Sequence, residues 1–203
     1  MTLMTWKYIA VAALVAGMVE SQTAKQKAAY PRMATAMKAF EADYTWEPVE
    51  FTTDDGYILT SFDIRKKDVE AVNPPVIFHH GNGWDAASWL QSLQADGTPF
   101  PLDFAAKGFP VWMMNQRGTE FSKRHVRLDP SSKAYWNYDI FGEWIDIKAN
   151  INIIKAYLGF DAYWYIGYSG ATTQMIYALV AEEPFLRNKL RKSLLLAPCK
   201  IRE

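Results

Sequence analysis

The residues best suited to carry chemistry lie in one segment near the end of the chain, residues 163–173, which reads YWYIGYSGATT. Its aromatic and apolar run stops at 167–171, and a helix-like stretch follows at 174–181. A buried strand, a tight turn with a serine and then a helix form the context of a nucleophile elbow. Ser169 is therefore the candidate nucleophile. Because Ala171 stands where the G-x-S-x-G pattern ends in glycine, the motif alone also fits a buried serine in a structural turn.

A second glycine-rich segment follows the predicted buried strand at 76–78 and reads HHGNG at 79–83. In parallel α/β sheets, ligands bind in the crevice at the carboxyl ends of the strands, where such loops lie. Right-handed crossover connections bring the carboxyl ends of parallel strands to one edge of the sheet. The sequence therefore predicts that the loop at 81–83 and the turn at Ser169 meet at the same edge.

The elements around these two segments predict an α/β fold whose sheet is mostly parallel. Its first two strands flank the turn Asp54-Asp55-Gly56 and form an antiparallel hairpin, and the later strands alternate with helices. The predicted strands are 49–52, 57–64, 76–78, 111–114, 163–166 and 193–197. The predicted helices are part of 23–46, then 86–93, 102–107, the amphipathic stretch 140–158 capped by Gly159, and 174–181, which ends at Glu183-Pro184.

Composition limits the classes of function. With 203 residues, half of them hydrophobic, the chain is long enough for one domain with a sizeable core. The 22 basic and 22 acidic side chains leave no net charge. A nucleic-acid-binding domain normally carries a basic stripe, so no nucleic-acid partner is predicted. No cofactor and no metal site are predicted either.

The first 22 residues differ in character from the rest. Lys7 is the only charged side chain before a short apolar run at 8–19, and the polar residues Glu20, Ser21 and Gln22 follow. Because a membrane span needs about 20 apolar residues, the pattern is more typical of a secretory signal peptide, with Ser21 as a small residue suited to cleavage. An uncleaved N-terminal anchor is the alternative. In both cases 23–203 is the predicted domain, and the chain is expected to enter the secretory pathway.

Cys199 is the only cysteine in the chain. A single cysteine is unusual in a secreted protein, where cysteines normally pair. Two interpretations remain open: a buried small hydrophobic side chain, or a cysteine whose partner is missing.

Five stretches of the chain resemble one enzyme family in order and spacing. They are FTTDDGYILT at 51–60, the HG pair at 80–81 with Trp89 behind it, NQRGTEFSKRHVRLDPSSKAYW at 115–136, YIGYSGATT at 165–173 and LLLAP at 194–198. Together they are similar to the acid lipases of the α/β-hydrolase fold, the gastric and lysosomal triacylglycerol and sterol-ester lipases. The resemblance covers nearly all of residues 30–199 and is far more specific than the serine motif alone.

The resemblance implies roles for residues in the two glycine-rich segments. Ser169 matches the nucleophile. Gly170 would offer its backbone N–H to the oxyanion, and Asn82 would offer the second N–H; such donors stabilise a tetrahedral intermediate by a few kcal/mol each. The implied substrate is a lipid ester, a triacylglycerol or a sterol ester, met at a lipid interface.

The elbow departs from the family pattern on both sides of the serine. The family usually has histidine before the nucleophile and Gln-Gly after it, where this chain has Tyr168 and then Gly170-Ala171. Because the oxyanion donors are backbone groups, these changes do not remove the hole, although glycine at 170 holds its donor less rigidly. The residues expected to support the elbow and the loop are Gly167, Tyr168, Ala171, His80 and Gly81.

The acid and the base of a serine triad are missing from their expected places. A serine needs a general base, and in this fold the acid and then the histidine follow the nucleophile. The chain has no histidine after Ser169, and the acids there are Glu182, Glu183 and Glu203. The three histidines precede the serine and are interpreted as structural: His79, His80 and His125.

The resemblance therefore implies the amino-terminal half of a lipase, an incomplete α/β-hydrolase fold without its last strands, lid, acid and base. Such a chain is expected to be inactive by itself. Two alternatives stay open: a non-catalytic half-hydrolase that acts in binding or assembly, and a half completed by a second chain at the edge strand 193–197, since unpaired strands seek partners. The family implies a secreted or lysosomal protein.

Overall fold

The computed structural model describes residues 25, 27–91, 94, 96–139, 143–180 and 184–199. The predicted signal peptide or anchor at 1–22 lies outside the described residues, as do Glu182, Glu183 and Glu203. Within the described ranges, no helix is both long enough and apolar enough to cross a membrane.

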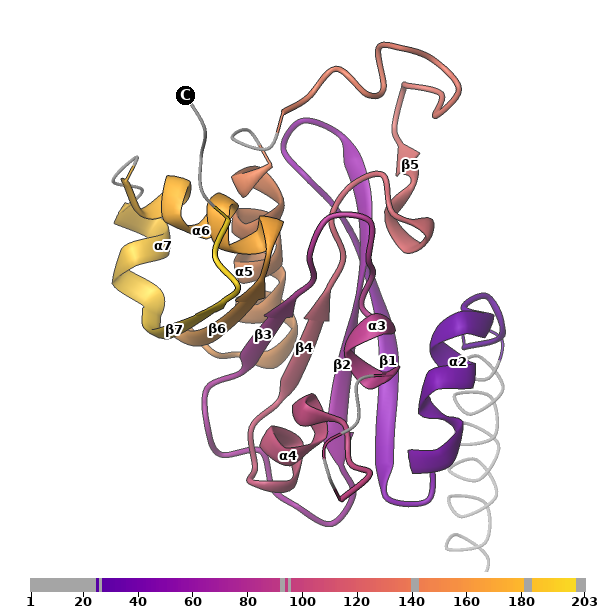
Figure 1. Ribbon diagram of the computed structural model, residues 1–203, viewed down its shortest axis with the longest axis vertical. Coiled ribbons are helices and arrows are strands. Elements are labelled where there is room, and N and C mark those ends of the chain that lie inside the picture. Colours follow the sequence, from indigo (N-terminus) through magenta and orange to yellow (C-terminus); the bar gives the residue numbers. More distant parts are fainter. Residues whose placement is uncertain are drawn as a thin grey trace, which may run out of the picture.

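A mixed sheet forms the centre of the fold (Figure 1). Its strands lie in the order β1-β2-β4-β3-β6-β7, and the short β5 pairs with β2. Their bounds are β1 Tyr44–Thr52, β2 Tyr57–Lys66, β3 Val76–His79, β4 Val111–Met114, β5 Arg124–His125, β6 Tyr163–Tyr168 and β7 Leu190–Leu196. The pairs β3–β4, β3–β6 and β6–β7 are parallel, whereas β2 runs antiparallel to its neighbours. The predicted α/β fold with an N-terminal hairpin is confirmed.

The hairpin is longer than its sequence pattern suggested. β1 begins at Tyr44 and pairs in register with β2 along its whole length, so that Tyr44 lies opposite Lys66 and Thr52 opposite Ile58. The turn closes where the N–H of Gly56 donates to the carbonyl of Thr53 (2.9 Å). Gly56 has a φ of 99°, a conformation that glycine adopts without steric cost.

Helices cover both faces of the sheet. One face carries α2 Pro31–Met37, the 3₁₀ turn η1 Lys38–Phe40, α3 Ser88–Gln91, α4 Phe100–Ala106 and the 3₁₀ turn η2 Glu120–Ser122, and the other carries α5 Trp144–Leu158, α6 Gly170–Val180 and α7 Pro184–Lys189. Side chains of the central strands alternate between the two layers: Phe78 and Met113 join the first core, and Ile77 and Trp112 the second. Strands buried on both faces read as continuous apolar runs, which is why they were recognisable in the sequence.

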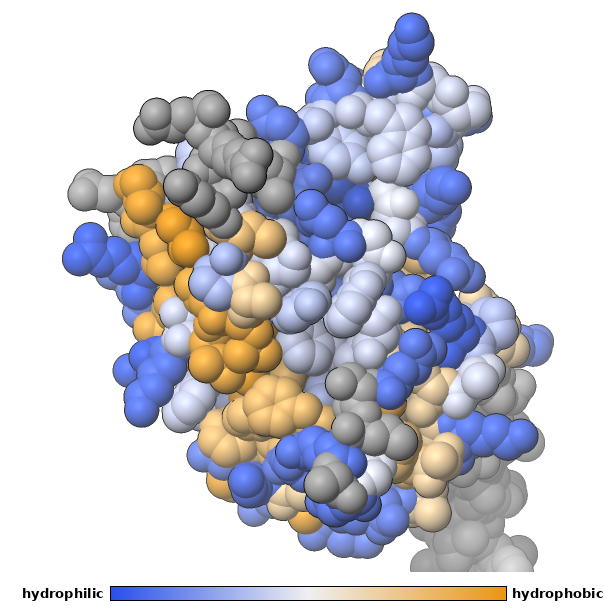
Figure 2. All heavy atoms as spheres, in the orientation of Figure 1, coloured by the Kyte–Doolittle hydropathy of each residue, from blue (hydrophilic) through white to orange (hydrophobic). Residues whose placement is uncertain are grey.

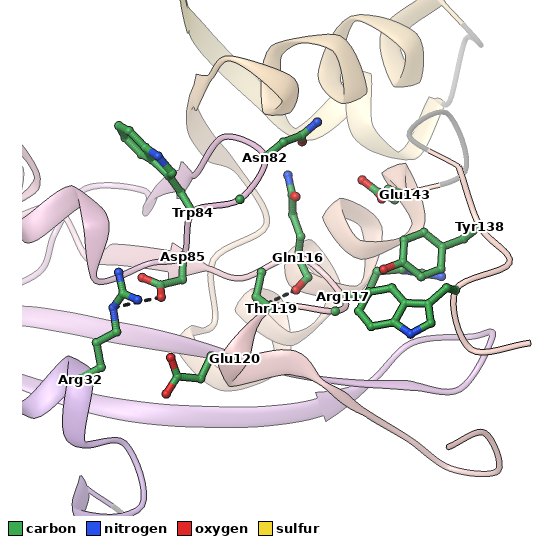
Figure 3. A pocket seen from close by; sticks show the side chains of 13 residues that line it. Arg32, Asn82, Trp84, Asp85, Gln116, Arg117, Thr119, Glu120, Tyr138 and Glu143 are labelled. Carbon is green, nitrogen blue, oxygen red and sulfur yellow. Dashed lines mark hydrogen bonds and ion pairs between the residues drawn. The ribbon is translucent and has the colours of Figure 1, made fainter. Parts of the chain in front are cut away.

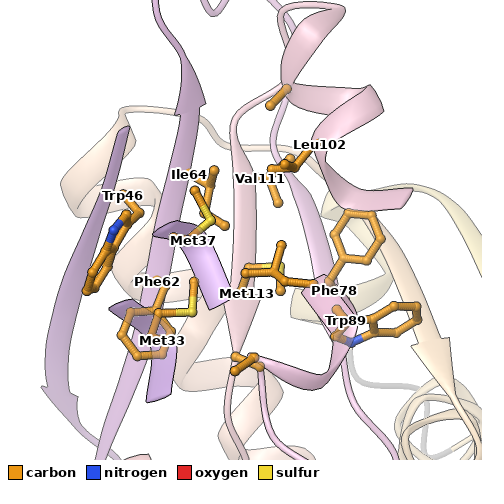
Figure 4. Close-up of a cluster of buried hydrophobic side chains, with 14 of the residues drawn as sticks. Met33, Met37, Trp46, Phe62, Ile64, Phe78, Trp89, Leu102, Val111 and Met113 are labelled. Atoms are coloured by element: carbon orange, nitrogen blue, oxygen red, sulfur yellow. The ribbon is translucent and has the colours of Figure 1, made fainter. Parts of the chain in front are cut away.

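The first core confirms a helix within 23–46. Figure 4 shows Met33 and Met37 of α2 over the strands, together with Trp46 and Phe62. All four side chains are at most 1% exposed. Because α2 covers the hairpin half of the sheet, it leaves the carboxyl ends of β3 and β6 open for the candidate site.

α5 confirms the predicted amphipathic helix over its described part. Ile147, Ile151 and Ile154 are buried in the second core. Gly159 caps the helix with a left-handed φ of 77°, and its N–H donates to the carbonyl of Lys155 (3.1 Å). The helix begins at Trp144, and the predicted start at 140 lies outside the described residues.

The elements after the elbow differ from the prediction. α6 begins at Gly170, directly after Ser169, rather than at 174. Pro184 does not simply end that helix; it begins α7, because the fixed φ and missing N–H of proline suit a first helical turn. β7 starts at Leu190 instead of 193 and lies at the edge of the described sheet. Leu194 of this strand is 46% exposed, which agrees with an uncovered strand.

Candidate active site

Ser169 lies at the junction of β6 and α6 on a left-handed turn. Its φ is 53°, a conformation that costs a non-glycine residue roughly 1–2 kcal/mol. Its N–H donates to the carbonyl of Leu196 at the end of β7 (3.0 Å), and its carbonyl accepts from the N–H (2.9 Å) and the hydroxyl (2.6 Å) of Thr172. These bonds hold a strained serine between a strand and a helix, which is the geometry of a nucleophile elbow.

The glycine-rich loop after β3 packs against this turn. A Cβ atom on Gly81 would lie 3.0 Å from Cβ of Ser169 and 3.0 Å from Cδ1 of Tyr168, so the close approach depends on glycine. A Cβ atom on Gly170 would lie 2.7 Å from Cγ of Asn82, which places the Asn82 side chain against the start of α6. Neither the N–H of Asn82 nor that of Gly170 donates to another described residue. Both donors are therefore left open next to the serine.

A stacked aromatic pair links the same two segments. Trp84, just after the loop, stacks on Tyr168 with ring centroids 4.9 Å apart and an interplanar angle of 21°. Such a pair contributes about 0.5–1.5 kcal/mol beyond the area that it buries. The stack therefore holds the loop against the residue that precedes Ser169.

A buried hydrogen-bond chain supports the elbow from inside the sheet. The Tyr165 hydroxyl donates to the carbonyl of Ala171 (3.0 Å), so it accepts from Nδ1–H of His79 (2.6 Å). Nε2 of His79 accepts in turn from the side-chain amide of Gln116 (2.8 Å). Burial holds the pKa of His79 well below its ordinary value, so the ring is neutral. Gly167 leaves room for this chain, because a Cβ atom there would lie 2.7 Å from the Tyr165 ring.

His80 is also buried and neutral, and it fixes the start of the glycine-rich loop. Its Nδ1–H donates to the carbonyl of Gly81 (2.9 Å), and its Nε2 accepts from the backbone N–H of Gln116 (3.2 Å). Burial lowers the pKa of His80 to about 4. Both ring nitrogens are occupied, so His80 acts on the loop and not on the serine hydroxyl.

His125 belongs to the hairpin end of the molecule. Its Nδ1 accepts from the N–H groups of Arg127 (2.9 Å) and Leu128 (3.1 Å), and its Nε2 lies 3.0 Å from the carbonyl oxygen of Asp55. Each of the three histidines in the sequence therefore has its ring nitrogens engaged with partners other than Ser169.

Cys199 is the side-chain neighbour of the Ser169 hydroxyl within the described residues. Its Sγ lies 3.4 Å from Oγ of Ser169, and its N–H donates to the hydroxyl of Thr172 (3.3 Å). The cysteine is exposed, so the interpretation of a buried hydrophobic residue is wrong. A thiol is only a weak hydrogen-bond partner, and it does not replace a general base.

A polar cavity of about 400 Å³ opens beside the glycine-rich loop (Figure 3). Its walls come from the loop at 82–85, from 116–120 after β4, and from Trp136, Tyr138 and Glu143. Arg32 of α2 pairs with Asp85 (3.2 Å) at this cavity. Across the described part of the chain, no group of three or more His, Cys, Asp and Glu side chains is placed to hold a metal ion.

Glu143 is the residue of this cavity that sequence reasoning missed. Burial, reinforced by the nearby charge of Asp146, raises its pKa to about 7. Its carboxylate accepts a hydrogen bond from the side-chain amide of Gln174 on α6. Nothing in the local sequence marks this glutamate, because its environment is made by residues that are distant along the chain.

Replacing Glu143 with glutamine is expected to flatten the pH dependence of stability. The pKa in the folded state, about 7, lies above the ordinary 4.5, so the folded protein resists ionisation of this carboxyl group. Its contribution is fully favourable below about pH 4.5, falls as the pH rises, and is lost above about pH 7. Denaturant unfolding gives the loss of unfolding free energy between pH 5 and pH 8. This loss should be roughly 2 kcal/mol smaller in the variant than in the parent protein. An equal loss in both proteins would contradict this assignment.

The family models match the two segments that form the site. Residues 74–195, from β3 into β7, match the model described as alpha/beta hydrolase fold. The chain belongs to the α/β-hydrolase family. Residues 37–93 match a second model, described as the partial alpha/beta-hydrolase lipase region. This α/β-hydrolase is therefore lipase-like, and the resemblance to the acid lipases is confirmed.

Curated relatives of this α/β-hydrolase are lipases. Lipase member M of Mus musculus is 33% identical, over 95% of this chain and 47% of the relative. Lipase member K of Homo sapiens is 32% identical over 76% of this chain and 39% of its own length. The putative lysosomal acid lipase/cholesteryl ester hydrolase of Crotalus adamanteus is 30% identical, over 95% of this chain and 50% of the relative. The chain thus spans about half the length, or less, of these relatives.

Solved structures share the fold with this α/β-hydrolase. The Pyrococcus furiosus esterase Pf2001 superimposes with a TM-score of 0.55 at 18% identity, over 80% of this chain and 54% of the esterase. Naproxen esterase from Bacillus subtilis gives a TM-score of 0.55 at 14% identity, over 83% of this chain and 48% of its own length. At these identities the likeness concerns the fold alone.

Proposed function

We propose that this α/β-hydrolase carries the nucleophile and the oxyanion hole of a serine hydrolase that acts on lipid esters, triacylglycerols or sterol esters. In the proposed reaction, the Ser169 hydroxyl attacks the ester carbonyl and loses its proton to a base. The N–H groups of Gly170 and Asn82 bind the resulting oxyanion. Collapse of the tetrahedral intermediate expels the alcohol and leaves an acyl-serine, which water then hydrolyses.

The left-handed φ of Ser169, 53°, is the observation that carries the proposal. Strain of this kind persists only where the surrounding structure imposes it, and it clusters at functional sites. Here it is combined with a glycine-rich loop packed directly on the serine through Gly81. A structural turn would require neither a strained serine nor the two open N–H donors beside it.

The proposal needs a general base and an acid from outside the described residues. No histidine follows Ser169, and the three that precede it are engaged elsewhere. We infer that an acid and a histidine follow Glu203 in a longer form of the protein. The 203-residue chain by itself should therefore hydrolyse esters orders of magnitude more slowly than a complete triad.

The names of the relatives support a lipid-ester substrate and a secretory location. One relative is described as a lysosomal acid lipase/cholesteryl ester hydrolase, and others as lipases. We propose that this α/β-hydrolase reaches the lysosome or the cell exterior, and that it meets its substrate at a lipid interface. The segment at 1–22 would direct it there as a signal peptide or an anchor.

A non-catalytic binding role is the second candidate function. The observation that favours it is the engagement of every histidine away from Ser169. A half-hydrolase of this kind would bind a lipid ester or another chain without turning it over. The uncovered edge strand β7 would then be the place where a completing chain docks.

Sequencing the transcript beyond Glu203 separates the two functions. The catalytic proposal predicts continued coding sequence with an aspartate and then a histidine, in the order that α/β-hydrolases use. A stop codon directly after Glu203, with no such continuation, would contradict the catalytic proposal and favour the binding role.

A further inference from the structure

Gln116, directly after β4 and its neighbour Asn115, bonds to both histidines at the start of the glycine-rich loop. Its backbone N–H donates to Nε2 of His80 (3.2 Å), and its side-chain amide nitrogen reaches Nε2 of His79 (2.8 Å) and the carbonyl oxygen of His80 (3.3 Å). A carbonyl oxygen can only accept, so the nitrogen end of the amide faces both groups. Gln116 is only 6% exposed, so water has little access to these bonds.

The orientation of Gln116 sets the direction of the whole hydrogen-bond chain below the elbow. Because Nε2 of His79 accepts from the amide, the ring proton lies on Nδ1 and donates to the Tyr165 hydroxyl (2.6 Å). The hydroxyl proton in turn donates to the carbonyl of Ala171 in the first turn of α6 (3.0 Å). No bond of this chain can be reversed without leaving a buried polar group unpaired, which costs about 1–3 kcal/mol.

These contacts end beside the two N–H groups proposed for the oxyanion hole. Ala171 directly follows Gly170, and His80 lies two residues before Asn82. Figure 3 shows the side chain of Gln116 directed towards Asn82. Gln116 is therefore one residue that reaches both the loop and the elbow.

Asn115 holds the far end of the same loop. Its side-chain oxygen accepts from the N–H of Ala86 (2.8 Å), and its amide nitrogen donates to the carbonyl of Thr60 on β2 (2.7 Å). Asn115 is fully buried. The two residues after β4 thus hold the glycine-rich loop at both ends and place it relative to the elbow.

The surface beside the elbow gives little electrostatic help to a negatively charged oxygen. Hydrophobic side chains gather over β7 and extend towards α4 (Figure 2). Stabilisation of an oxyanion therefore depends on backbone N–H groups, which act only when they point at the position of the developing charge.

We infer that Gln116 is a positioning residue of the oxyanion hole, an inference that rests on the proposed function of Ser169. It fixes the N–H groups of Asn82 and Gly170 relative to each other. It acts through the two buried histidines and Tyr165. Because a misplacement of about 1 Å can cost about 10²-fold in rate, loss of the Gln116 amide should slow the reaction of the serine.

Two variants interrupt these contacts at different points, and a third leaves them intact. Gln116→Met removes the donor and keeps the length of the side chain, and Tyr165→Phe removes only the hydroxyl. Tyr163→Phe is the matched control, because Tyr163 lies on the same strand, is also 1% exposed and also donates to a backbone carbonyl, that of Leu186 (3.0 Å). Tyr165→Phe also keeps the test valid if Gln116→Met does not fold.

The maximal rate at which a small fluorophosphonate labels Ser169, with imidazole as an external base, measures the effect. This rate should fall at least about tenfold in Gln116→Met and Tyr165→Phe and stay within about threefold of the parent in Tyr163→Phe. Because Tyr165 is buried, the probe concentration that gives half of the maximal rate should not change in its variant.

Two further measurements report on the same contacts without any reaction at the serine. NMR of the histidine rings should show His79 protonated at Nδ1, with a slowly exchanging proton that is lost in Tyr165→Phe and kept in Tyr163→Phe. The N–H of Thr172 donates to the carbonyl of Ser169 (2.9 Å). Its hydrogen exchange should become at least about tenfold faster in Gln116→Met and Tyr165→Phe and stay unchanged in the control.

The inference and the proposed function fail in different experiments. A parent protein that is not labelled at Ser169 would contradict the proposed function, and ring NMR and amide exchange would then still test whether Gln116 fixes the elbow. Equal labelling rates in Tyr165→Phe and Tyr163→Phe, or a parent-like rate in Gln116→Met, would overturn the inference. A His79 ring protonated at Nε2, or equal exchange of the Thr172 N–H in all variants, would overturn it as well.

Discussion

Replacing Arg117 with methionine is expected to lower the free energy of unfolding by about 3–5 kcal/mol, because it leaves a buried carboxylate without its partner. The side chains of Arg117 and Asp146 are 2% and 0% exposed, and Nη2 of the arginine lies 2.6 Å from Oδ1 of the aspartate. The other end of the guanidinium group pairs with Asp55 of the hairpin turn (2.6 Å). Burial raises the pKa of Asp146, and Arg117 opposes this rise. Without the arginine, the buried carboxyl group must either bind a proton or remain charged and destabilise the fold.

The position of Arg117 explains why its loss should reach the candidate site. Its guanidinium carbon lies 4.0 Å from the centroid of the Tyr57 ring, and its backbone N–H donates to Oδ2 of Asp146 (2.9 Å). One side chain thus ties the hairpin, the segment after β4 and the start of α5 together, at the wall of the polar cavity. Denaturant unfolding of the purified protein measures the effect.

Two further variants distinguish the effect of breaking the buried ion pair on stability from the effect of losing a positive charge. Arg124→Met breaks the exposed pair with Glu50, whose side chains are 59% and 44% exposed, and should change the unfolding free energy by less than about 1 kcal/mol. Asp146→Asn in the Arg117→Met background should recover at least about 1 kcal/mol, because it removes the unpaired charge. Equal effects of Arg117→Met and Arg124→Met would contradict this account.

Gly81→Val is expected to slow the reaction of Ser169 with a fluorophosphonate probe at least about 100-fold. The new side chain would meet Cβ of Ser169 at 3.0 Å and the backbone oxygen of Tyr168 at 3.3 Å, neither of which can swing away. The loop must therefore move off the elbow and carry the N–H of Asn82 with it. Loss of one oxyanion donor, the role proposed for this N–H, costs about 10²–10³ in rate, and a displacement of about 1 Å has a similar cost.

Gly97→Val is the matched control for this change. Gly97 also precedes a helix, but a Cβ atom there has no neighbour within 4 Å among the residues that the structure describes. Its φ of 81° means that valine adds backbone strain in a place away from the elbow. The control should lower stability and leave the labelling rate within about threefold of the parent. Labelling of Gly81→Val at the rate of the parent protein would show that the loop does not shape the reactive site.

The elements that the sequence predicted well are those determined by burial on both faces of the sheet. The sequence predicts β4 at 111–114 and the end of β3 to within one residue, because parallel strands read as apolar runs bounded by glycine and proline. The sequence predicts too late a start for α6, since Gly170, Thr172 and Thr173 have low helix propensity; in the structure these residues are helical and buried. The sequence pattern predicts a helix end at Pro184, although proline also suits the first turn of a helix.

The site was predictable only where it depends on local backbone geometry. The strand, turn and helix around Ser169 and the glycine-rich loop after β3 follow from short motifs, and chain topology brings them together. The partners of Arg117, Asp55 and Asp146, lie 62 and 29 residues away from it, and no local signal reveals such pairing. The same holds for the raised pKa of Glu143.

The rate at which a fluorophosphonate probe labels Ser169, with and without imidazole, tests the central claim most directly. A serine that is correctly placed but lacks its base should react slowly alone and at least tenfold faster with imidazole as an external base, since general bases contribute about 10²–10⁴ in rate. Mass spectrometry should find the adduct on Ser169, and Ser169→Ala should remove it. Absence of any adduct on Ser169 at high imidazole, or equal labelling in Ser169→Ala, would contradict the claim that this residue is the nucleophile.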